Sequence, residues 1–147
     1  MARSERRSGA VSTWGRSLNR SAFVQLGLVG LGGGLGSVLR FLVSGWSHRL
    51  LPELLFPVGT VAVNVLGCLA IGLLAGVADL RQALGPQARV FLMIGVLGGF
   101  TTFSTFAYES LELTQGGEAA KALINVAGQL VLGLAAAWLG YSLAKVV

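Results

Sequence analysis

Glycines and hydroxyl residues interrupt a hydrophobic segment at residues 90–108, where the sequence reads GVLGGFTTFSTF over residues 95–106. A bilayer core holds no water, so backbone that leaves helical pairing there must be buried in protein or line a cavity. Paired glycines weaken a helix, and paired threonines offer competing hydroxyls, so we predict a helix break at Gly98–Thr102. Carbonyls and helix ends exposed at such a break can bind ions.

Two phenylalanines follow the predicted break. Phe103 and Phe106 are three residues apart and so share one helix face, with Ser104 and Thr105 between them. Aromatic ring edges carry the positive end of the quadrupole and can face an anion. The same spacing also occurs in ordinary packing or lipid-facing pairs, and the residues alone leave both interpretations open.

Other polar side chains occur inside apolar runs. Asn64 must hydrogen-bond to a partner helix or face a watery vestibule, because an unpaired amide in a membrane costs free energy. Arg40, expected near the far interface, either reaches the lipid headgroups or serves an anion route. Asn125, Gln129 and Gly133 recur every four residues, which predicts one polar stripe facing the protein interior.

The remaining inventory argues against enzyme chemistry. The chain has one histidine and one cysteine, so neither a metal-ligand cluster nor an internal disulfide framework can be built from them. No nucleophile, base and orienting acid can be assembled at membrane depth. We interpret His48 as an interfacial loop residue, and Glu109 and Glu112 as interfacial charges rather than buried proton carriers.

Composition and hydropathy indicate a polytopic membrane protein. The 147 residues are 54% hydrophobic and 12% charged, and the mean hydropathy is +0.74. Apolar runs of roughly 18 or more residues are candidate spans. We therefore predict an all-α protein, residues 22–147, with four transmembrane helices at about Ala22–Ser44, Leu54–Val77, Val90–Tyr108 and Lys121–Lys145.

The first 21 residues form a basic polar arm. Such an arm before a span is typical of cytoplasmic retention under the positive-inside rule, and we prefer this to nucleic-acid binding. Four spans place both termini on one side, where eight of the eleven basic residues fall, against two opposite. We expect a multi-pass plasma membrane protein in contact with lipid, in bacteria an inner membrane protein.

Three strings together carry a family resemblance. GGFTTFSTF at residues 98–106, GTVAVNVLG around Asn64 and GGGLGSVLRF in the first span resemble the Fluc (CrcB) family of fluoride channels. The resemblance covers all four spans and leaves only the arm outside. It implies passive fluoride export that relieves fluoride toxicity, through an antiparallel dual-topology dimer with two pores.

The resemblance also assigns roles to residues. It implies a central structural sodium ion on the backbone carbonyls of Gly98 and Thr101, a phenylalanine pair at Phe103 and Phe106, and a pore amide at Asn64. The implied polar track passes Ser104 and Thr105 and continues along the fourth span. There Asn125, Gln129 and Gly133 stand where hydroxyl residues are common in the family. Apart from the resemblance, Arg40 is included in the candidate fluoride pathway as the cation of an anion route.

Two other functional classes remain to be compared. A four-span dual-topology drug/proton antiporter needs a carboxylate deep in the membrane, and no Asp or Glu lies in the middle of a predicted span. A non-transporting scaffold subunit would explain the glycine faces but not Asn64 or the Thr/Ser/Phe cluster. The partner is either a second copy or, given the charge bias, an oppositely oriented paralogue.

Overall fold

Helices are the only regular secondary structure in the described part of the chain. The computed structural model describes residues 20–50 and 56–146, and four of its helical segments are long and apolar enough to cross a membrane. This confirms the predicted all-α membrane class. The elements are α1 (Arg20–Leu50), α2 (Val58–Leu80), α3 (Pro86–Arg89), the π-helix η1 (Val90–Val96), α4 (Leu97–Phe100), α5 (Phe103–Gln115) and α6 (Ala119–Leu143).

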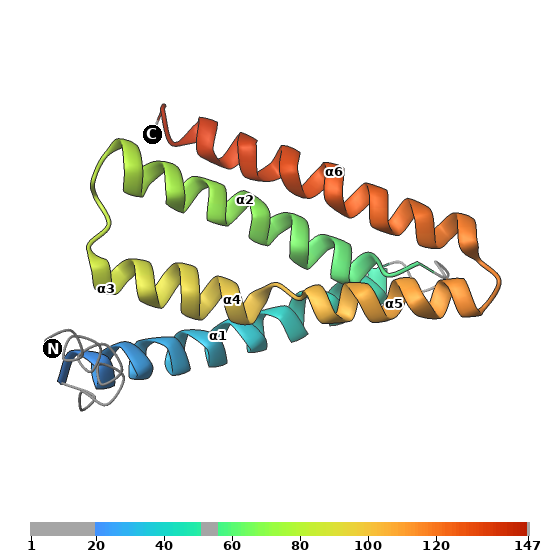
Figure 1. Cartoon of the computed structure of the whole chain (residues 1–147), viewed down its shortest axis with the longest axis horizontal. Helices are drawn as coiled ribbons and strands as arrows, with labels where there is room; N and C mark the ends of the chain where they lie inside the picture. The colour runs from blue at the N-terminus through green and yellow to red at the C-terminus, as the bar shows by residue number, and fades with distance from the viewer. Residues whose placement is uncertain (1–19, 51–55, 147) are drawn as a thin grey trace, which may run out of the picture.

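The spans pack as two pairs. Helix α6 runs along α2, and α1 runs along the third span, which comprises α3, η1, α4 and α5 (Figure 1). The start of α1 and the end of α6 lie at the same end of the molecule, together with the turn between α2 and α3. This arrangement agrees with four alternating membrane crossings.

Glycines let both pairs approach closely. A Cβ atom added at Gly32 or Gly36 of α1 would collide with the backbone of η1, at Phe91 or Val96 respectively. In the other pair, a Cβ at Gly72 or Gly140 would collide with backbone of the facing helix. Such small-residue contacts replace the hydrophobic drive that is absent between helices in lipid.

The third span is interrupted as predicted, but over fewer residues. Gly98 lies inside the single turn of α4, and extended backbone is confined to Thr101 (φ −79°, ψ 158°) and Thr102 (φ −150°, ψ 110°). Before the break, the π-helix carries a wider turn, and the Leu97 amide donates to the Leu92 carbonyl five residues back. Nothing in the sequence pattern indicated this π-helix.

The placement of His48 in a loop is wrong. Helix α1 continues to Leu50 and therefore includes the backbone of both His48 and Arg49. The sequence offers no proline or glycine between Gly45 and Pro52 to end the helix earlier. Pro52 itself and the basic arm of residues 1–19 lie outside the described residues.

The close packing of α1 on η1 can be tested with one alanine. Gly36→Ala places a methyl group against the Val96 carbonyl, so we expect the free energy of unfolding to fall by about 1–3 kcal/mol. Equilibrium unfolding in mixed detergent micelles measures the change. The matched control is Gly34→Ala, because nothing lies within 4 Å of a Cβ there. An equal response of the two variants would contradict the packing.

Candidate functional site

Asn64 holds the break in the third span. Its side-chain oxygen Oδ1 accepts from the Thr102 amide at 2.9 Å, and its Nδ2 donates to the Thr102 carbonyl at 3.2 Å. A single side chain therefore pairs both backbone groups of the extended residue, as a neighbouring β-strand would. In a medium without water this pairing removes the main cost of interrupting a helix.

The break also diverts two amide groups from the helical ladder. The Thr102 amide, which a continuous helix would donate to Gly98, donates to Asn64. The Thr105 amide, which would pair with Thr101, donates instead to the Thr102 hydroxyl at 3.3 Å. The carbonyls of Gly98 and Thr101 are thus released from helical pairing. Both residues line one cavity, and a Cβ on Gly98 would meet nothing within 4 Å.

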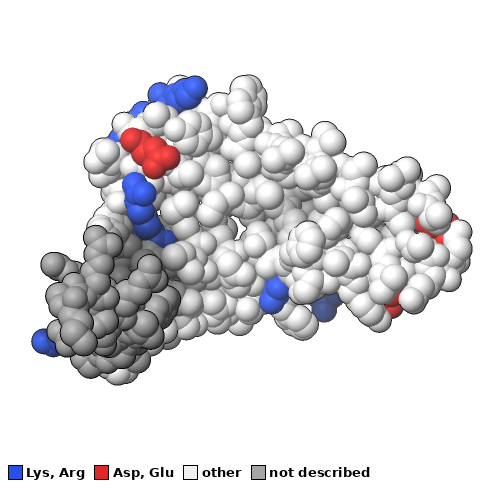
Figure 2. Space-filling view, viewed as in Figure 1, with Lys and Arg blue, Asp and Glu red and all other residues white. Residues whose placement is uncertain are grey.

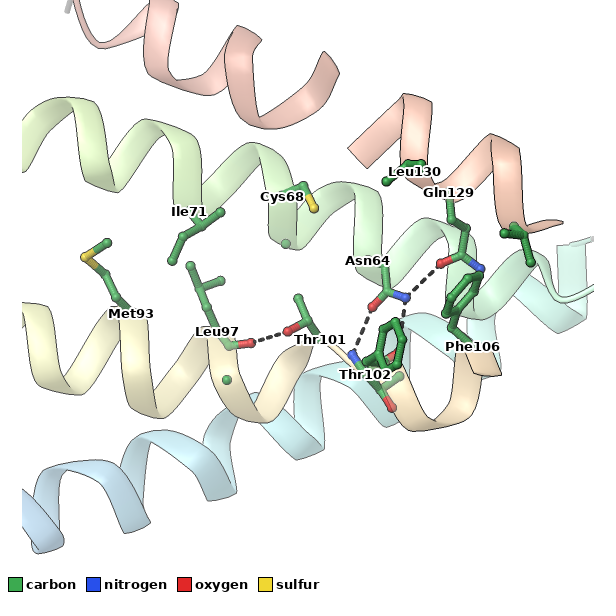
Figure 3. Close-up of a pocket in the computed structure, with 14 residues that line it drawn as sticks. Asn64, Cys68, Ile71, Met93, Leu97, Thr101, Thr102, Phe106, Gln129 and Leu130 are labelled. Atoms are coloured by element: carbon green, nitrogen blue, oxygen red, sulfur yellow. Dashed lines mark hydrogen bonds between the residues drawn. The ribbon is translucent and has the colours of Figure 1, made fainter. Parts of the chain in front are cut away.

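Three side-chain amides extend from the break in a chain (Figure 3). Asn64 Nδ2 donates to Gln129 Oε1 at 2.8 Å, and Gln129 Nε2 donates to Asn125 Oδ1 at 2.9 Å. Asn125, which has no exposed surface, donates to the Ser110 hydroxyl at 3.0 Å. The sequence prediction of an inward-facing stripe at Asn125, Gln129 and Gly133 is confirmed, since all three are buried.

The amide chain borders a cavity of about 660 Å³. Its polar end includes Asn64, Thr102 and Gln129, whereas aliphatic side chains such as Ile71 and Leu97 line the rest (Figure 3). Phe103 and Phe106 contribute to the same wall. Their ring centroids are 5.5 Å apart with the planes inclined at 53°, so the predicted shared face is confirmed.

Arg40 lies at the break rather than at an interface. Its Nη1 donates to the Thr101 carbonyl at 3.5 Å, and the residue is half-buried. The expected position near the far interface is therefore wrong. Arg40 follows Gly32 and Gly36 at intervals of four residues, so the glycine contacts with η1 bring its side chain to the third span.

The predicted hydroxyl residues have different surroundings from the amides. Ser104 and Thr105 are exposed, and both lie within hydrogen-bonding distance of the Thr102 hydroxyl, at 3.4 and 2.9 Å. Thr102 itself is 8% exposed and caps α5. The structure brings together Asn64, Gln129 and Asn125, and it leaves Ser104 and Thr105 outside their chain.

Several polar residues of the site were not selected from the sequence. Thr102 is the centre of the break, and Ser110 ends the amide chain. Thr60 donates to Glu109 Oε1 at 2.7 Å, and Glu109 is half-buried and lines a second cavity with Glu112, next to the loop before α6. Thr60 precedes Asn64 by one helical turn, and this spacing was the available signal.

The chain is similar to known proteins over most of its length. The family model described as "CrcB-like protein, Camphor Resistance (CrcB)" matches residues 27–141. A relative from Nitratidesulfovibrio vulgaris, named fluoride-specific ion channel FluC, is 48% identical over 120 residues, covering 82% of this chain and 96% of the relative. A relative from Thermus thermophilus with the same name is 52% identical over 116 residues, covering 79% and 90% respectively.

The pairing of Asn64 with Thr102 predicts a local effect of mutation. Asn64→Leu leaves the Thr102 amide and carbonyl without their partner, at a cost of about 1–3 kcal/mol for each unsatisfied group. We expect lower stability and faster hydrogen exchange of the Thr102 amide, measured in detergent micelles. Gln129→Met is the control, because it keeps both bonds between Asn64 and Thr102. Unchanged Thr102 exchange in Asn64→Leu would contradict this role.

Proposed function

Because the chain belongs to the CrcB family, and relatives from two bacteria are named fluoride-specific ion channels, we propose that it conducts fluoride passively across the membrane. The observation that carries the proposal is the chain of amides from Asn64 through Gln129 to Asn125. It begins at a break in a transmembrane helix and runs through the interior of the helix bundle. Export down the fluoride gradient would relieve fluoride toxicity.

The amide chain offers the chemistry that fluoride requires. Fluoride is small and strongly hydrated, so a pore must replace its water with N–H and O–H donors. A side-chain amide has two N–H donors, and the contacts within the chain use one of Gln129 and one of Asn125. Both N–H donors of Asn64 are used, by the Thr102 carbonyl and by Gln129 Oε1, whereas the second donor of Gln129, which lines the cavity, can bind an anion there. A narrow track of N–H and O–H donors excludes the larger chloride ion by size.

Phe103 and Phe106 supply the aromatic part of the proposed pathway. They line the cavity next to Asn64 and Gln129, and Phe103 is 78% exposed. Ring edges directed at an anion add electrostatic attraction without a competing positive charge. Ser104 and Thr105 are exposed beside the same rings and add hydroxyl donors, and Arg40 adds positive charge at the break.

The released carbonyls fit a structural sodium site. Gly98 and Thr101 would hold the ion with backbone oxygens, the ligand type that hard cations prefer. Both carbonyls lack their helical donors, since the amides of Thr102 and Thr105 are paired elsewhere. When bound, sodium would supply positive charge beside the break.

An antiparallel dimer agrees with the distribution of charge. Basic and acidic groups lie together at one end of the molecule, and acidic groups lie at the opposite end (Figure 2). Arg89 pairs with Asp79 beside the start of the third span, whereas the lining of the second cavity includes Glu109, Glu112, Glu118 and Lys121. An inverted partner sets its acidic end beside the end of this chain that carries basic groups. The partner is a second copy or an oppositely oriented paralogue.

The function is tested by fluoride efflux from liposomes that contain only this protein. We expect efflux down the fluoride gradient without a proton gradient, measured with a fluoride electrode. Transport of a cationic drug coupled to protons would indicate the antiporter class instead. If the purified protein shows no fluoride efflux, but efflux appears when an oppositely oriented paralogue is added, the channel is a heterodimer. No efflux in either case would favour a scaffold.

The phenyl rings give a sharper prediction. Phe106→Ile and, separately, Phe103→Ile keep hydrophobic bulk but remove the ring edge. We expect fluoride flux to fall at least about tenfold, equivalent to roughly 1.4 kcal/mol on the barrier, while the protein elutes as the wild type does. Phe23→Ile, on the exposed face of α1, is the control. Near-normal flux in both site variants would return the pair to a packing role.

A further inference from the structure

The backbone contacts between α1 and the third span fix the position of Arg40. Gly32 and Gly36 touch the backbone of η1, and Gly99 of α4 touches the backbone of Gly33. Arg40 is the next residue on the face of Gly32 and Gly36, one helical turn further. Because helix backbones in such direct contact cannot slide freely, the Arg40 side chain emerges beside the break.

The Arg40 side chain is a cation without a carboxylate partner in the described part of the chain. The ion pairs there join Arg89 to Asp79 and Lys121 to Glu118. Arg40 instead donates to the Thr101 carbonyl, 61 residues away in sequence. That carbonyl is among those that the break releases, because the Thr105 amide donates elsewhere. A guanidinium is always charged, so its positive charge stays at this position.

We propose that Arg40 is a tethered cation that shares the Thr101 carbonyl with the sodium site and weakens sodium binding there. This inference rests on the proposed sodium site at Gly98 and Thr101. A carbonyl oxygen has two lone pairs, so it can accept from a guanidinium and still face a metal ion. Arg40 thus lowers the sodium affinity through its charge.

The direction of the effect follows from charge. Two positive groups on one oxygen repel each other, and the repulsion is strong where water is excluded. Removal of the guanidinium charge therefore favours sodium at this carbonyl. The loss of one long hydrogen bond at 3.5 Å disturbs the carbonyl little, because Thr101 is also held by its amide and hydroxyl, both of which donate to the Leu97 carbonyl.

The test compares sodium affinity in Arg40→Met, Arg40→Lys and the wild type. Purified protein in detergent is titrated with NaCl against N-methylglucamine chloride at constant ionic strength, and the midpoint of thermal unfolding reports binding, since a ligand of the folded state raises it. We expect Arg40→Met to bind sodium at least about tenfold more tightly. We expect Arg40→Lys, which keeps the charge, to remain within about threefold of the wild type.

A matched control removes a charge elsewhere on the same helix. Arg49→Gln lies at the exposed end of α1, and we expect sodium affinity to be unchanged there. If Arg40→Met does not fold, Arg40→Gln provides a second neutral variant with a polar side chain. Either neutral variant is sufficient for the comparison.

The outcomes separate this inference from the proposed sodium site. Equal or weaker sodium binding in the neutral variants, with a wild type that responds to sodium, overturns the role of Arg40 and leaves the site standing. A wild type that does not respond to sodium overturns both. Fluoride efflux measured in parallel shows whether the channel function stands independently.

Discussion

The structure depends on the cost of leaving backbone groups unpaired inside a membrane. The third span can be interrupted at Thr101 and Thr102 only because Asn64 pairs both backbone groups of Thr102. This one interaction fixes α2 against the third span and releases the carbonyls before the break. It also orients Asn64 Nδ2 toward Gln129. The fold and the candidate ion pathway therefore share the same hydrogen bonds.

Glycine packing is the second requirement, because it brings polar groups to the break from distant parts of the chain. Because α1 packs closely on η1, the Arg40 side chain lies within hydrogen-bonding distance of the Thr101 carbonyl. Close approach of α6 to α2 at Gly72 and Gly140 aligns the two helices that carry the amides. The glycines on these helix faces thus bring the polar side chains together, although they supply no polar side chain themselves.

The sequence predicted features that depend on local pattern. The apolar runs predicted the four spans, and the glycines and threonines at residues 98–102 predicted the break. The four-residue period predicted the buried stripe that includes Asn125 and Gln129. Features that need a partner from another span were missed. The bond from Thr60 to Glu109 spans 49 positions in sequence, and the contact of Arg40 with Thr101 spans 61. The spacing of Thr60 and Asn64 places both on one helix face, but no local pattern identifies the partner on the other span.

The central claim is that fluoride binds at Gln129, in the hydrogen-bonded chain of side-chain amides that joins Asn64 to Asn125. Side-chain amide resonances of the 15N-labelled protein in micelles test it most directly, with fluoride and chloride titrated separately. The account predicts that the resonances of Asn64, Gln129 and Asn125 shift with fluoride and not with chloride, while that of Gln87 in α3 stays constant. Equal shifts with both anions, or none at these three amides, would contradict it.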